Sequence, residues 1–193
     1  MVKFEICEST GYWCKYTAFY VEHRQRIIPG YQVKHALADV KHCMRNGSAA
    51  ILTNEQNQVI GIGGFVLGLE KDGFNNKNIA VLGNSYFAEE YRSNRTFIRG
   101  LQVLAEKIGE LNGDVREVRI PTSAGNAYTN GLYRKFAEMT DTAETPYGPF
   151  HIYSVGYDAF ASFCGRFRQS GQAGGCRQSI KTTKRKNGEM PHE

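Results

Sequence analysis

Three arginines, Arg92, Arg95 and Arg99, lie around the start of a predicted helix. Asn94 is a suitable N-cap for this helix, because its side chain can accept a hydrogen bond from an amide of the first turn. The first N–H groups of a helix have no partner within it, and the helix dipole adds partial positive charge at this end. Open amides together with arginines are typical of an anion site, and a phosphate is the natural ligand.

The helix itself is indicated by the spacing of its apolar residues. Steps of four, three, four and three residues place one set on a single helix face: Phe97, Leu101, Leu104, Ile108 and Leu111. Asn112-Gly113 is a suitable stop after them. A strand is expected directly before the helix, at residues 79–87, so the helix N-terminus faces the space above the end of that strand.

Two other patterns that could indicate a functional site are weaker. His35 and His42 lie seven residues apart on one predicted helix, but no carboxylate or cysteine completes a metal site at ligand spacing, so no metal is expected. Residues 61–64 (GIGG) resemble part of a dinucleotide fingerprint, but position 66 is Val and the run lies inside a predicted hairpin. Glycines in a strand indicate instead a bulge or a close backbone approach.

The composition indicates one globular domain. The chain has 193 residues, of which 41% are hydrophobic, and this is enough to bury a core. No apolar run approaches the roughly 20 residues that cross a bilayer, and the N-terminus has no signal-peptide pattern, so we expect a cytoplasmic protein. The five cysteines form no CxxC pair, and reduced thiols are expected in that compartment.

The net charge of +5 belongs to the C-terminal tail. Residues 165–193 contain seven Lys or Arg and two Glu, whereas 17 basic and 17 acidic residues cancel in residues 1–164. The tail has no apolar face, so we expect it to be disordered. It is also a candidate for binding nucleic acid or an acidic partner, although no aromatic residues are interleaved with residues 181–186 and a solvated end is the simpler interpretation.

Hydrophobic patterns predict the remaining elements. Strands are expected at residues 3–7, 49–53, 59–67, 79–87, 115–120, 140–145 and 150–155. Helices are expected at residues 12–20, 33–46, 94–111, 124–139 and 157–167. Pro121 is expected to close the fifth strand, and the second helix is expected to bury Val33, Leu37, Val40 and Met44. This order predicts an α/β fold with a twisted mixed sheet and helices on both faces.

Three motifs in this order resemble the GNAT superfamily of acyl-CoA-dependent N-acyltransferases. Residues 59–61 (VIG) look like the end of a family strand, and residues 87–92 (FAEEYR) resemble the exit from the central strand into the cofactor loop. Asn126 and Tyr133, followed by residues 134–136 (RKF), are similar to a family helix. The match covers roughly residues 1–155, and it implies a GNAT-like sheet and acetyl-CoA as acyl donor.

In this family a turn of small residues wraps the pyrophosphate of CoA. The resemblance places that turn at residues 92–97, where Arg95 and Phe97 stand in place of small residues, so the pyrophosphate loop is atypical. Backbone amides of residues 85–87 are expected to hold the pantetheine and the thioester carbonyl. The cofactor-binding residues implied in this way are Ser85, Tyr86, Phe87, Arg92, Ser93, Asn94, Arg95, Thr96, Phe97 and Asn126.

The resemblance also implies that Tyr133 protonates the departing thiolate, since a tyrosine hydroxyl stays protonated at pH 7. The alternative for Tyr133 is a core residue with a satisfied hydroxyl, and the alternative for Asn126 is a helix N-cap. No single general base stands out, and a water-relayed base is an equal alternative. The side-chain candidates for the base are Glu70, Asp72, Glu89, Glu90 and His23.

The sequence therefore predicts an N-acetyltransferase that acts on a primary amine, carried by a small molecule or a protein. The acceptor is expected to enter between the N-terminal helices and the turn at residues 146–149. The alternative is a catalytically inert GNAT-like binding or regulatory protein that contacts nucleic acid or an acidic partner through its tail. The expected boundaries are a GNAT-like domain at 1–156, a helical extension at 157–168 and the basic tail at 169–193.

Overall fold

The computed structural model describes residues 2–166, and in this range seven strands form one sheet in the order β1-β2-β3-β4-β5-β7-β6. Neighbouring strands are antiparallel except for β4 and β5, which are parallel. The mixed sheet predicted from the sequence is thus confirmed. The strands are β1 (Lys3–Ile6), β2 (Gly47–Thr53), β3 (Val59–Leu67), β4 (Ile79–Phe87), β5 (Glu117–Ser123), β6 (Glu138–Thr145) and β7 (Gly148–Gly156).

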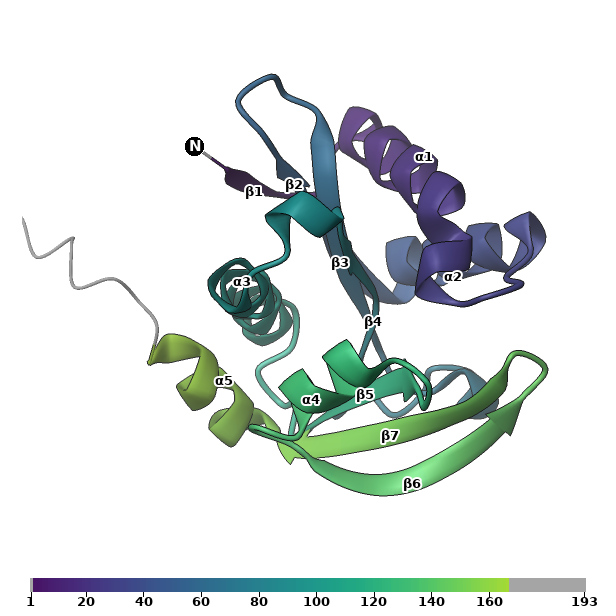
Figure 1. The fold of residues 1–193 in the computed structure, drawn as a ribbon. Helices are drawn as coiled ribbons and strands as arrows, with labels where there is room; N and C mark the ends of the chain where they lie inside the picture. The colour runs from purple at the N-terminus through teal and green to yellow at the C-terminus, as the bar shows by residue number, and fades with distance from the viewer. Residues whose placement is uncertain (1, 167–193) are drawn as a thin grey trace, which may run out of the picture.

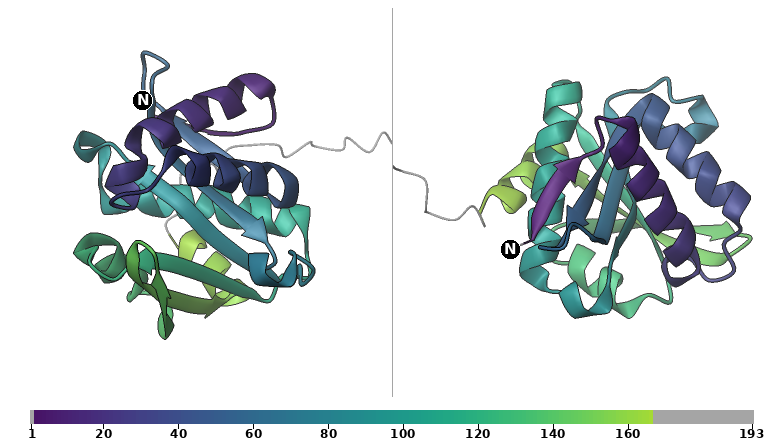
Figure 2. Two further views of the ribbon diagram at one scale, coloured as in Figure 1. Left: turned by 90° about the vertical axis from the view of Figure 1, so that its right-hand side faces the viewer. Right: turned by 90° about the horizontal axis from the view of Figure 1, so that it is seen from above.

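Helices cover both faces of the sheet, as Figures 1 and 2 show. Helices α1 (Thr10–Ile27) and α2 (Val33–Asn46) pack on β2 and β3 from one side. Helix α3 (Asn94–Leu111) packs on the other side of these strands, and α5 (Tyr157–Gly165) packs against α3 and β7. The short helix α4 (Ala127–Tyr133) lies against β5. No helix in residues 2–166 is long and apolar enough to cross a membrane.

Each face of the sheet has its own apolar core. The core beneath α1 and α2 is rich in aromatic residues and contains Tyr16, Phe19, Tyr20, Ile51 and Ile62. The core beneath α3 and α5 is larger and contains Phe65, Leu82, Ile108, Val118 and Phe160. Because β3 and β4 have buried residues on both faces, they form the rigid centre of the domain.

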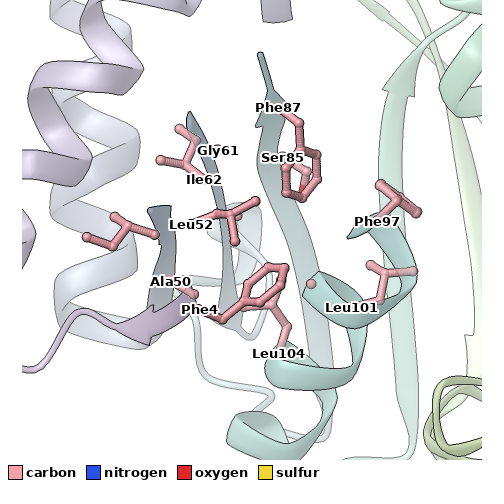
Figure 3. Close-up of a pocket in the computed structure, with 13 residues that line it drawn as sticks. Phe4, Ala50, Leu52, Gly61, Ile62, Ser85, Phe87, Phe97, Leu101 and Leu104 are labelled. Atoms are coloured by element: carbon pink, nitrogen blue, oxygen red, sulfur yellow. The ribbon is translucent and has the colours of Figure 1, made fainter. Parts of the chain in front are cut away.

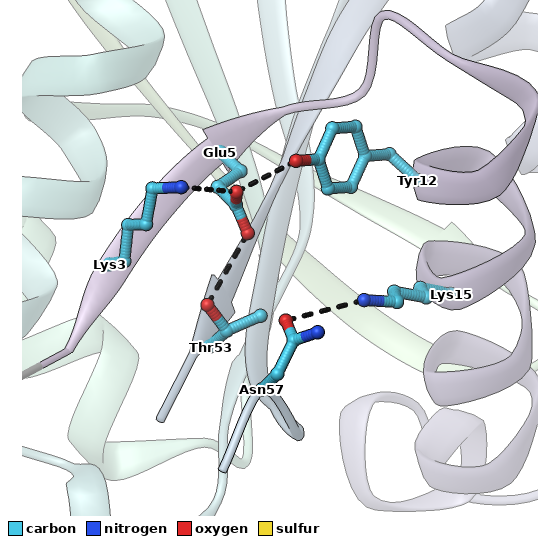
Figure 4. Close-up of polar contacts among 6 residues, drawn as sticks. All are labelled: Lys3, Glu5, Tyr12, Lys15, Thr53 and Asn57. Carbon is cyan, nitrogen blue, oxygen red and sulfur yellow. Dashed lines mark hydrogen bonds and ion pairs between the residues drawn. The ribbon is translucent and has the colours of Figure 1, made fainter. Parts of the chain in front are cut away.

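A cluster of polar side chains connects the edge strand β1 to α1 and β2 through hydrogen bonds (Figure 4). The Glu5 carboxylate accepts hydrogen bonds from Lys3 Nζ at 2.7 Å, from the Tyr12 hydroxyl at 2.8 Å and from Thr53 Oγ1 at 3.4 Å. The bonds from Lys3 and Tyr12 lower the pKa of Glu5. A second contact, from Lys15 Nζ to Asn57 Oδ1, joins α1 to the β2–β3 turn.

The predicted apolar face of α2 is wrong. Ala36, Val40 and Cys43 face the core, whereas Val33, Leu37 and Met44 are exposed. The reason is the close approach of α2 to the sheet: a Cβ placed on Gly64 would lie 3.1 Å from Cys43 Sγ. Only small residues fit on the inner face at this distance, so the larger apolar residues lie outside it.

Three other details also differ from the sequence prediction. Leu111, in the last turn before the chain leaves α3 at Asn112, is 48% exposed and does not join the buried stripe. Pro121 lies within β5, where it pairs with Ile152 of β7. The fourth helix is half as long as expected, because the chain from Glu138 onward pairs with β7 instead.

The predicted helical extension is a packed element. Phe160 of α5 is fully buried in the core beneath α3. Residues 167–193, which include Cys176 and the predicted basic tail, lie outside the described range, so the expectations for the tail stay predictions. The four cysteines within the range, Cys7, Cys14, Cys43 and Cys164, form no disulfide.

We expect Phe160→Ala to lower the free energy of unfolding by about 3–5 kcal/mol, because it leaves a cavity in the core beneath α3. Urea denaturation followed by circular dichroism measures this change. Ser162→Ala, at an exposed position of the same helix, is the matched control and should have no effect. A small loss for Phe160→Ala would show that α5 is an appendage and not a part of the domain core.

Candidate functional site

The site begins where β4 and β5 part. The two parallel strands pair only from Ile79↔Glu117 to Val81↔Arg119. Beyond this point the facing edges of β4 and β5 have no sheet partner, and the two strands separate (Figure 1). Pro121, which has no N–H to donate, lies on β5 beyond the last of these pairs. Open backbone edges of this kind are binding positions for an extended ligand.

A bulge in β4 lies at the same place. Ile62 pairs with Tyr86 and Gly64 with Gly83, so Gly63 alone stands opposite two residues of β4, Asn84 and Ser85. Asn84 adopts φ of 56°, a left-handed conformation that Asn tolerates better than most residues. The bulge twists β4 away from β5 and turns its backbone amides out of the ladder with β3.

A cavity of about 210 Å³ occupies the opening between the strands. Its walls come from β4, β5, α4, the start of α3 and the end of α1. Among residues 2–166, Arg26 and Arg92 are its only charged lining residues, and no carboxylate of this range contributes to it. The Arg92 guanidinium stacks over the Tyr86 ring and donates to the Phe87 carbonyl at 2.9 Å. The cavity is therefore positively charged and suits an anionic ligand.

Seven of the eleven predicted site residues meet in this cavity. The lining residues among them are Ser85, Tyr86, Phe87, Arg92, Phe97, Asn126 and Tyr133. The other four, Ser93, Asn94, Arg95 and Thr96, belong to the first turn of α3 and its cap, and Ser93, Arg95 and Thr96 do not line the cavity. They lie directly after Arg92 in the chain, so they adjoin the cavity rather than form it.

The first turn of α3 corrects two expectations. Ser93, and not Asn94, is the N-cap, since Ser93 Oγ accepts from the Thr96 amide at 3.1 Å. The Ser93 carbonyl accepts from the Phe97 amide, so a phosphate at this end would have to use the amides before Thr96. The Phe97 side chain points inward and packs against Phe87 and Tyr133, so it does not cover the turn.

Beneath this turn lies a much smaller apolar cavity of about 20 Å³ (Figure 3). Phe87 lies at its upper end, Phe97 and Leu101 line the side formed by α3, and Phe4 and Leu104 lie at its lower end. Ser85 is the only polar residue that lines it in the described part of the chain. With so little room and polarity, this cavity is a packing space between α3 and the sheet and supplies no chemistry.

Tyr133 is 4% exposed and packs among Phe97, Phe136 and Tyr153. Burial raises the pKa of its hydroxyl well above the usual value. Its hydroxyl has no hydrogen-bond partner among residues 2–166, and the side chain lines the positively charged cavity. Tyr133 is thus a residue of the core beneath α3 whose hydroxyl has no partner in residues 2–166, and its role as an acid stays a prediction.

Asn126 is the N-cap of α4, because its Oδ1 accepts from the Thr129 amide at 3.2 Å. The sequence analysis missed Asn130, whose buried amide joins the cap to β7. Asn130 Nδ2 donates to the Ser123 and Asn126 carbonyls, and its Oδ1 accepts from the Tyr153 hydroxyl at 2.8 Å. This network fixes α4, and with it Tyr133, against the sheet.

A second cavity at the opening between β4 and β5, of about 290 Å³, lies on the side of the sheet that faces α2. It shares four lining residues with the first cavity, so the two meet at the opening between β4 and β5: Leu82, Gly83, Asn84 and Pro121. Its charged or titratable lining residues include Asp39, His42 and Glu70. The far side of the opening is therefore acidic, in contrast to the arginine-lined side.

The predicted base candidates are spread over the molecule. Glu70 lines the second cavity but is largely exposed and lies 4.0 Å from His42 Nδ1. Asp72, Glu89 and Glu90 are exposed and line neither cavity. His23 stacks on the Tyr86 ring, away from the cavity surface, and burial lowers its pKa. Asp39, which the sequence analysis did not consider, is the half-buried carboxylate nearest the opening.

No family model matches this chain, and no curated protein matches it. Solved structures do. A GNAT-family acetyltransferase from Staphylococcus aureus is 12% identical with a TM-score of 0.62, and the match covers 80% of this chain and 99% of that one. The ribosomal-protein-S5-alanine acetyltransferase of Vibrio fischeri is 9% identical with a TM-score of 0.60, covering 81% and 93%.

An aminoglycoside acetyltransferase, solved with coenzyme A and kanamycin, is 15% identical with a TM-score of 0.59, covering 84% of this chain and 98% of that one. At this level of identity the likeness establishes the fold. The chain has the GNAT acetyltransferase fold, as the sequence motifs predicted.

The capping role of Asn126 can be tested separately from ligand binding. We expect Asn126→Ala to lower the free energy of unfolding by about 1 kcal/mol, because the Thr129 amide loses its acceptor. Asn126→Ser, which supplies another capping oxygen, should recover most of this loss in urea denaturation. If Asn126→Ala leaves stability unchanged but weakens CoA binding in both variants, the residue binds the ligand and does not serve mainly as a cap.

Proposed function

We propose that this protein transfers an acetyl group from acetyl-CoA to a primary amine. The observation that carries the proposal is the charge of the two cavities that meet at the opening between β4 and β5. One side is lined by Arg26 and Arg92 without a carboxylate, and the other by Asp39 and Glu70. An anionic thioester donor suits the first side and a cationic amine suits the second.

The residues on the donor side fit the chemistry of CoA. The bulge at Asn84–Ser85 offers amides to the pantetheine and the thioester carbonyl, where a donor stabilises the oxyanion that develops during transfer. We assign Arg92 and the early amides of α3 to the pyrophosphate, because a positive charge and open amides suit a phosphate. Structural neighbours that were solved with coenzyme A support this assignment at the level of the fold.

Tyr133 is the proposed acid. Its raised pKa keeps the hydroxyl protonated at neutral pH, so that it has a proton to give to the thiolate as the C–S bond breaks. Because its hydroxyl has no partner within residues 2–166, it is available to the sulfur. The acceptor is proposed to enter on the acidic side. The Tyr147 hydroxyl contacts His35 there, so the tip of the β6–β7 hairpin already touches α2.

Calorimetric titration with acetyl-CoA and with CoA tests the donor site. We expect micromolar dissociation constants for both. Absence of binding at millimolar acetyl-CoA would contradict the proposal, and it would favour the alternative of an inert GNAT-like binding protein. Titration with acetyl phosphate, which lacks the pantetheine and the nucleotide, is the control for binding of anions in general.

We expect Tyr133→Phe to lower kcat by about 100-fold or more, since positioned proton donors contribute this much. The dissociation constant of acetyl-CoA should stay unchanged, because the ring and its packing are preserved. Tyr128→Phe, which removes another hydroxyl from the same cavity wall, is the matched control. Thiol release from acetyl-CoA in the presence of an amine measures kcat, and an unchanged kcat would exclude Tyr133 from the mechanism.

A further inference from the structure

The acidic cavity contains a carboxylate with an unusual hydrogen-bond arrangement. Both hydrogen bonds to Asp39 go to the same oxygen: the Tyr20 and Tyr31 hydroxyls each donate to Oδ2 at 2.7 Å. No residue in the range 2–166 donates to Oδ1. Asp39 also lines the cavity, and Oδ1 is not among the buried atoms that lack a partner, so this oxygen faces the cavity.

Asp39 lies at the opening between the strands and not at the outer rim of the cavity. The Tyr20 hydroxyl is 2.7 Å from Asp39 Oδ2 and 2.8 Å from Asn84 Oδ1, so one hydroxyl bridges the carboxylate and the bulge of β4. A hydroxyl has only one proton. When the Asn84 amide is oriented with its NH₂ group toward Tyr20, Asn84 donates to the Tyr20 hydroxyl, and that hydroxyl donates to Asp39 Oδ2.

From this geometry we propose that Asp39 binds the acceptor amine through Oδ1 and takes its proton, so that it is the general base of the transfer reaction. This inference rests on the proposed function and extends it to the residue that sequence analysis could not identify. The two tyrosines are positioning residues, because they hold Oδ2 and thereby direct Oδ1 into the cavity.

The ammonium group of the acceptor gives one proton to Asp39 Oδ1, and the freed nitrogen lone pair attacks the carbonyl carbon of the acetyl thioester. The C–N bond forms, the C–S bond breaks, and the thiolate takes the Tyr133 proton. As the amide forms, the acceptor nitrogen loses a second proton, and this proton goes to the Tyr133 oxygen. Asp39 later releases its own proton to water.

The environment of Asp39 agrees with this role. Burial raises the pKa of its carboxyl group, and this makes the carboxylate a stronger base than an exposed aspartate. The titratable groups around it are Tyr16 and Tyr20 of α1, Tyr31 of the following loop, His42 and Cys43 of α2, and Glu70 of the loop after β3. Arg26 and Arg92 line only the other cavity.

The test is Asp39→Asn, which preserves the shape and the acceptor for the two tyrosines but cannot take a proton. Spermidine, kanamycin and a peptide with an N-terminal alanine serve as probe amines with acetyl-CoA as donor. For each amine that the wild type acetylates, kcat should fall by about 100-fold or more. The dissociation constant of acetyl-CoA, measured by calorimetry, should not change. Glu106→Gln, on the opposite face of the sheet, is the control for loss of one negative charge.

A second measurement keeps the proposal testable if Asp39→Asn folds poorly. Tyr31→Phe removes one hydrogen bond to the carboxylate, so it should raise the pKa of Asp39 further. The acidic limb of the pH profile of kcat/KM should then shift to higher pH. His42→Gln should shift that limb in the same direction but less, because the charge of His42 lowers the pKa of Asp39 less than the Tyr31 hydrogen bond does. A limb that disappears in His42→Gln and does not move in Tyr31→Phe would overturn the proposal.

The outcomes separate the two hypotheses. A wild type that binds no acetyl-CoA, or acetylates none of the three probe amines, contradicts the proposed function. A wild type that is active, together with an Asp39→Asn variant that retains wild-type kcat, overturns the role of Asp39 alone. Loss of kcat at unchanged acetyl-CoA affinity, with the pH shift in Tyr31→Phe, supports both.

Discussion

The separation of β4 from β5 after three residue pairs is the constraint on which the rest of the structure depends. A sheet that stayed paired along both strands would satisfy its own backbone groups and leave no room between them. Here the bulge at Asn84 and the proline at position 121 both disfavour further pairing. The hairpin β6–β7 and helix α4 then hold β5 in the open position from its other side.

This opening also divides the charges of the domain. Residues 1–164 have no net charge, yet the two cavities that meet at the opening differ in sign. The difference arises from which elements line each side: the end of α1 and the turn before α3 supply arginines, whereas α2 and the loop after β3 supply carboxylates. A thioester with phosphates and an amine would therefore be drawn to opposite sides of the same strand edge.

The sequence could predict those features that depend on local pattern. The order of the strands and helices, and seven residues of the cavity lining, followed from periodicity and from motif resemblance. The inner face of α2 could not be predicted, because it is set by the close approach of Gly64 and not by the hydrophobicity of α2 itself. Asp39 was missed for a similar reason: its partners Tyr20 and Tyr31 come from other elements, and only the fold brings them together.

Phe97 departs from the family pattern, and its contacts in the structure give a reason for its size. In sequence it stands where a small residue usually allows a phosphate to approach the backbone. In the structure its ring lies 6.2 Å from that of Phe87 and 5.8 Å from that of Tyr133, so it joins β4, α3 and α4 in one aromatic wall. A small residue here would leave Tyr133 without this support on one side, and its hydroxyl would be less firmly placed at the cavity. The bulky residue thus serves the position of the proposed acid, while the open amides of the turn remain available to an anion.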